Sequence, residues 1–147
     1  MAHEILSVKL YELDQKIGLM HSRIQLSETA SHDQIKNEVA NLRKECDENA
    51  LTLRNKLKFS RAGRVVKLSE AYGKVEQIIE KVKSEFPSPK SERWNEELSV
   101  EEKLLLAEYA LDFAVQVANH ALLISMEAIE AQMTKQEKDE ERKNERG

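Results

Sequence analysis

The segment from residue 104 to residue 126 constrains the fold more than any other part of the chain, because seventeen of its twenty-three residues are apolar. Its polar residues Glu108, Asp112, Gln116 and His120 recur every four residues. On a helix of about 3.6 residues per turn this spacing makes one narrow stripe and leaves the other sides apolar. A helix apolar on nearly every side has to be surrounded by protein. We therefore expect this segment to be a helix at the centre of the fold.

The composition predicts an all-α protein. Charged residues make up 34% of the chain and aromatic residues 5%, with only four glycines and two prolines. Sheets need more β-branched residues, aromatics and turn residues than this. A length of 147 residues fits a single domain that can bury a core without disulfides.

Three upstream segments repeat large apolar residues at alternating spacings of four and three, which is typical of helices that pack through a heptad seam. Ser31 with Gln34, and Ser99 with Glu102, are spaced as capping boxes that start the second and fourth helices. The sequence predicts four helices, which cover residues 3–26, 32–60, 63–86 and 99–135.

The similar lengths of the first three helices favour an antiparallel four-helix bundle with coiled-coil-like seams. Gly63 is the expected stop of the second helix. The apolar spacing nevertheless continues through residues 58–64, so a single long helix that fuses the second and third is the alternative. We expect residues 1–133 to form one bundle domain. In residues 134–147, ten of fourteen are charged and none is apolar, which predicts a frayed or disordered tail.

The fourth helix also predicts self-association. Three helices that are each apolar on one face cover about two thirds of it, and a homodimer is the simplest way to cover the remainder. A band of small residues on this helix would let another helix approach closely. The band consists of Ala107, Ala110, Ala114, Ala118 and Ala121.

No motif in the sequence specifies a catalytic chemistry, and we expect a non-enzymatic interaction or assembly protein without a cofactor. The competing hypothesis is a ligand or metal site on the polar stripe, with Glu108, Asp112 and His120 as candidate ligands. Helical metal sites take ligands from two or more helices, and the inward positions upstream offer only Cys46. We therefore favour a stripe that faces solvent. Cys46 itself is expected to be a small core residue.

The segment between Asn49 and Ser69 contains no acidic residue. Its basic residues could bind an anion, a phosphate group or nucleic acid at the tip of a helical hairpin. We favour a structural interpretation, in which cations near the end of a helix complement its dipole. A net charge of −4 also argues against DNA or anionic lipid as the main partner. The basic residues are Arg54, Lys56, Lys58, Arg61, Arg64 and Lys67.

The run from residue 104 to residue 126 is long enough to be compared with a membrane span. Glu108 and Asp112 lie inside it, and each carboxylate would cost roughly 2.5–3.5 kcal/mol at the bilayer centre. We therefore expect no membrane association. The single cysteine and the absence of an apolar leader at the N-terminus favour a cytoplasmic protein.

Overall fold

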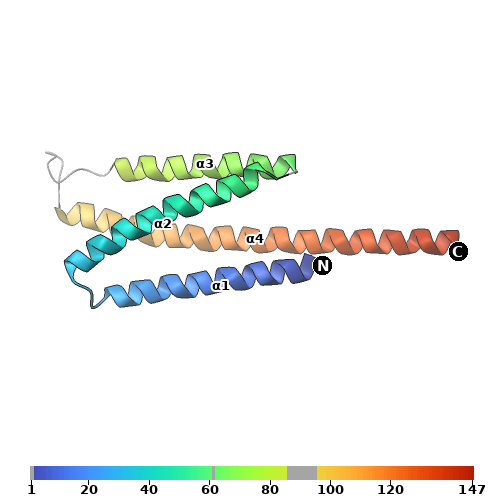
Figure 1. The fold of residues 1–147 in the computed structure, drawn as a ribbon, viewed down its shortest axis with the longest axis horizontal. Helices are drawn as coiled ribbons and strands as arrows, with labels where there is room; N and C mark the ends of the chain where they lie inside the picture. The colour runs from blue at the N-terminus through green and yellow to red at the C-terminus, as the bar shows by residue number, and fades with distance from the viewer. Residues whose placement is uncertain (1, 61, 86–95) are drawn as a thin grey trace. The chain divides into compact units, whose positions relative to one another are not determined.

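The computed structural model describes residues 2–60, 62–85 and 96–147. These residues form four α-helices and no strand: α1 (Ala2–Ser27), α2 (His32–Lys58), α3 (Gly63–Ser84) and α4 (Glu96–Arg146) (Figure 1). The prediction of an all-α protein with four helices is confirmed.

The start of α2 agrees with its predicted capping box. The side-chain oxygen of Ser31 accepts a hydrogen bond from the backbone N–H of Gln34 at 3.2 Å, and the Gln34 side chain accepts one from the Ser31 N–H at 2.8 Å. Each residue therefore satisfies a backbone donor that the first turn of a helix would leave unpaired. The helix begins at His32, as the spacing of the two residues predicts.

The alternative of one fused helix through residues 58–64 is wrong, because α2 ends at Lys58 and α3 begins at Gly63. The N–H of Phe59 bonds to the carbonyl of Leu57 and closes the last turn of α2. Gly63 is therefore the first residue of a helix, and the expectation that it stops one is also wrong. No glycine in the described ranges has the positive φ that a glycine helix stop uses.

The predicted bounds of α4 need two corrections. The helix begins at Glu96, so Ser99 lies one turn inside it and does not cap it. Glu97 in the first turn favours this earlier start, since a carboxylate complements the positive end of a helix dipole. The helix also continues beyond residue 135 to Arg146, through glutamate, lysine, arginine and glutamine, which are strong helix formers. Fraying of residues 134–147 in solution stays a prediction.

The chain divides into two compact units, residues Met1–Gln25 with Val100–Gly147, and residues Leu26–Ser99. We call the first, which holds α1 and most of α4, the terminal unit. In it α1 runs antiparallel to α4, and residues from His3 to Leu13 share a groove with residues from Ala121 to Ile129 (Figure 1). The C-terminal end of α4 extends past the start of α1 (Figure 1).

The second unit, which we call the hairpin unit, contains α2 and α3 as an antiparallel pair (Figure 1). The two helices meet at their connecting turn, where Leu57, Val65 and Val66 are half-buried. Farther from the turn the helices diverge, and Ile79 and Val82 are exposed. The apolar seam of this hairpin is therefore closed only next to the turn.

Neither unit has a closed hydrophobic core. Over the described ranges, no apolar side chain is buried, and large apolar side chains are exposed on all four helices. In the terminal unit, α1 is the only other helix and can cover one face of α4. An antiparallel bundle with α4 at its centre stays a prediction. No helix in the described part of the chain has the length and apolarity that a membrane span requires.

Candidate functional site

The polar stripe of α4 lies on the surface. Glu108, Asp112, Gln116 and His120 all have exposed side chains. Nowhere in residues 2–60, 62–85 and 96–147 do three histidine, cysteine, aspartate or glutamate side chains come together as metal ligands would. Most of α4 is exposed, so the exposure of the stripe alone does not separate a solvated edge from a ligand site. That the stripe binds nothing stays a prediction.

The alanine band of α4 is divided between two environments. Ala121 lines the groove shared with α1, and Ala118 is half-buried one turn before it. Ala107, Ala110 and Ala114 are exposed. The groove shared with α1 therefore includes only the C-terminal end of the band.

A second face of α4 is apolar and exposed. Phe113, Val117 and Ile124 are 71%, 68% and 66% exposed. At 100° per residue they share one face, which lies roughly 130° around the helix from the side that meets α1. We call these three residues the open seam. The sequence contained the signal, because the apolar run covers almost the whole circumference of the helix, but the face that α1 takes could not be inferred from it.

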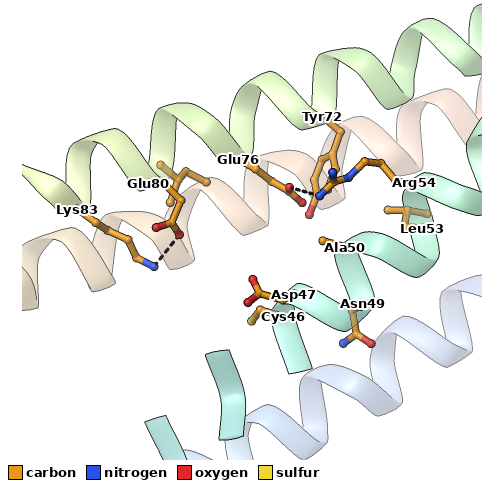
Figure 2. Close-up of a pocket in the computed structure, with 11 residues that line it drawn as sticks. Cys46, Asp47, Asn49, Ala50, Leu53, Arg54, Tyr72, Glu76, Glu80 and Lys83 are labelled. Atoms are coloured by element: carbon orange, nitrogen blue, oxygen red, sulfur yellow. Dashed lines mark hydrogen bonds and ion pairs between the residues drawn. The ribbon is translucent and has the colours of Figure 1, made fainter. Parts of the chain in front are cut away.

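A groove of about 640 Å³ lies between α2 and α3 where they diverge (Figure 2). Arg54 of α2 reaches across it to Glu76 of α3, with 3.5 Å between guanidinium nitrogen and carboxylate oxygen. Lys83 and Glu80 form a second ion pair along α3, at 3.2 Å. Exposed pairs of this kind contribute about 0–1 kcal/mol each. Of these two pairs, only Arg54–Glu76 joins the two helices, so the pairs do not hold the hairpin closed.

Tyr72 projects from α3 into the same groove, beside Arg54 and Glu76 (Figure 2). Partial burial raises the pKa of its phenol, and the neighbouring Glu76 carboxylate raises the pKa further by its charge and by accepting the phenol hydrogen bond. Both effects disfavour the phenolate. The phenol of Tyr72 is therefore held in its neutral form beside the Glu76 carboxylate.

Cys46 lines this groove from α2 and is exposed. The expectation that it is a buried core residue is wrong. The apolar spacing of α2 correctly placed Cys46 on the side that faces α3. The two helices have already diverged at that level, so nothing covers the thiol within the described hairpin.

The turn between α2 and α3 gathers the basic residues predicted for it. Lys56 and Lys58 are in the last turn of α2, and Arg64 and Lys67 are near the start of α3. Arg54 is one turn back and pairs with Glu76. Arg61, the remaining predicted member, lies outside the described residues. We call Lys56, Lys58, Phe59, Arg64 and Lys67 the basic tip.

Helix dipoles explain only half of the basic tip. Lys56 and Lys58 sit at a helix C-terminus, where cations are favourable. Arg64 sits in the first turn of α3, where the dipole is itself positive and a cation is unfavourable, and Lys67 lies in the following turn. That terminus has no acidic residue in its first turn, and Ala62 offers no side-chain cap. The dipole therefore accounts for the cations at the end of α2 and gives no reason for Arg64 at the start of α3. Anion binding by the cluster stays a prediction.

Phe59 lies at the end of the hairpin, between the cations of the two helices. It is 81% exposed, more than any other large apolar side chain in the described ranges. The second predicted helix, residues 32–60, includes Phe59, so the sequence contained no sign that its ring would be exposed at a turn.

A four-helix fold carries no function by itself. Matched against protein-family models, curated proteins and solved structures, the chain shows no match to any of them.

Proposed function

We propose that this chain is a non-enzymatic assembly module that acts through protein–protein contacts, and that its first partner is a second copy of itself. The observation that supports the proposal most directly is that no apolar side chain in the described ranges is buried. Soluble proteins rarely leave contiguous apolar surface of this kind uncovered. A homodimer covers it with no additional partner.

The open seam is the surface that we assign to the dimer. Phe113, Val117 and Ile124 repeat at spacings of four and seven, which suits a helix-to-helix contact. The groove shared with α1 occupies a different side of α4. In a two-fold arrangement the open seam of one copy would lie against the open seam of the other, and each pair of α1 and α4 would supply half of a four-helix bundle.

Two variants at adjacent positions test this assignment. Val117→Glu places a charge in the open seam, and Gln116→Glu places the same charge one residue away in the polar stripe. A carboxylate buried without a partner is strongly unfavourable. We expect Val117→Glu to weaken self-association by at least about ten-fold, and Gln116→Glu to leave it unchanged.

The experiment measures the melting temperature by circular dichroism at several protein concentrations. Binding of a second copy makes the melting temperature rise with concentration. We expect that rise for the native chain and for Gln116→Glu, and its loss for Val117→Glu. Equal concentration dependence in all three proteins would contradict the open seam as the interface.

A further inference from the structure

We propose that the basic tip is a docking site for an anionic lipid surface, into which the ring of Phe59 inserts. The tip belongs entirely to the hairpin unit, whereas the open seam belongs to the terminal unit. This inference therefore goes beyond the proposed function and does not depend on self-association. It revises the expectation of no membrane association, which considered a helix that spans the bilayer and the net charge of the whole chain. The proposal concerns attachment of one local cluster to the face of a bilayer and needs no helix that crosses one.

The charge of the tip is uncompensated within the described hairpin. Lys56, Lys58, Arg64 and Lys67 are exposed, and none forms an ion pair with another described residue. The sequence from Asn49 to Ser69 supplies no acidic residue that could neutralise them. Clusters of lysine and arginine are attracted to the negative surface potential of membranes rich in anionic lipid.

Arg64 and Lys67 give this attraction a structural reason. Arg64 stands in the first turn of α3, which has no side-chain cap, so its charge adds to the positive end of the helix dipole, and Lys67 adds a second charge one turn later. Phosphate groups are well suited to such a terminus, because they meet side-chain cations and unpaired backbone N–H groups together. A phosphate-bearing surface would therefore remove an unfavourable arrangement that the hairpin alone leaves in place.

Phe59 favours a lipid surface over nucleic acid as the phosphate-bearing partner. Its ring is the most exposed large apolar group in the described ranges, and it stands at the turn with cations on both sides. Proteins that bind single-stranded nucleic acid stack successive bases on several aromatic side chains. The basic tip has one ring. A single projecting ring surrounded by cations matches the boundary between headgroups and acyl chains, where apolar side chains insert by about 5–10 Å.

Vesicle co-sedimentation with the full chain tests the proposal. The native protein is mixed with vesicles of phosphatidylcholine alone, or with vesicles containing about one third phosphatidylserine, at low and at high salt. We expect binding only to the phosphatidylserine vesicles, and its loss at high salt. Absence of binding to these vesicles at low salt would overturn the proposal.

Two pairs of variants separate charge from insertion. Lys58→Gln with Arg64→Gln removes two charges from the tip, and we expect affinity to fall by roughly five-fold for each. The matched control, Lys135→Gln with Lys138→Gln, removes two charges from the end of α4 and should bind as the native chain does. Phe59→Ala should weaken binding by about ten-fold or more, whereas Tyr11→Ala on α1 should not. Equal behaviour of a tip variant and its control would overturn the proposal.

A fluorescent reporter tests insertion directly. Phe59→Trp in a Trp94→Phe background leaves one tryptophan, at the tip. We expect its emission to shift to shorter wavelength on phosphatidylserine vesicles and to be quenched by brominated acyl chains. Unchanged emission on bound vesicles would overturn the insertion of the ring. Tip-dependent binding of a single-stranded oligonucleotide, without vesicle binding, would replace lipid by nucleic acid and overturn the assignment of the partner.

Discussion

Gly18, in the middle of α1, shows how one residue reports on what surrounds a helix. A methyl group added at this position would meet nothing within 4 Å. Glycine in a helix interior is less favourable than alanine by about 0.5–1 kcal/mol, because it loses more backbone freedom on folding. The glycine therefore has no packing role inside the terminal unit.

We predict that Gly18→Ala raises the free energy of unfolding by about 0.5–1 kcal/mol, measured by urea denaturation. Gly63→Ala, at the first residue of α3, is the matched control and should have a smaller effect. A decrease in stability for Gly18→Ala would mean that another helix contacts α1 at this residue in the assembled protein.

Tyr72 makes the stability of the hairpin depend on alkaline pH. Its pKa in the folded chain is raised above the ordinary value of 10.0, so folding favours the protonated phenol. This contribution is fully present below pH 10 and is lost as the pH rises through the folded pKa. Tyr72→Phe removes the titrating group, and we expect it to lose less stability than the native chain when the pH rises past 10. Parallel losses in both proteins, in urea melts at each pH, would contradict this.

The sequence predicted that the four helices exist better than it predicted which helix lies next to which. Apolar spacing and the Ser31–Gln34 pair placed the start of α2 correctly. The prediction that Ser99 caps α4 was wrong, because a serine followed by glutamate three residues later resembles a capping box even inside a helix. The helix begins three residues earlier, at Glu96. The prediction that Cys46 is buried was wrong for another reason. A seam indicates which side of a helix is apolar, but not whether another helix still lies opposite at that level.

The hairpin of α2 and α3 is testable by one distance. Spin labels at Ala50 and Val75 lie on the two helices, and the antiparallel pairing predicts that they are close together. A continuous helix would separate them by about 37 Å, at 1.5 Å per residue. We predict a short distance by pulsed electron resonance. A distribution centred near the longer value would contradict the break between Lys58 and Gly63.

At the scale of the whole molecule, the apolar run of α4 was the strongest signal in the sequence, but it gave only part of the packing. It correctly predicted a helix that is apolar on most of its sides, and many of these side chains are exposed in the chain by itself. It could not predict what covers each face, because cover depends on where other helices lie, and periodicity contains no information about that. The charges of the basic tip were likewise evident from the sequence, whereas the exposure of Phe59 depends on the turn that ends α2.

We propose that the open seam of α4 pairs with the open seam of a second copy of the chain. Sedimentation equilibrium at micromolar concentration tests it most directly, because it measures mass without reference to shape. We predict a species of twice the 16.9 kDa chain mass in exchange with the monomer. Val117→Glu should shift this exchange to the monomer, whereas Gln116→Glu should not. A single species of 16.9 kDa for the native chain throughout that concentration range would contradict the claim.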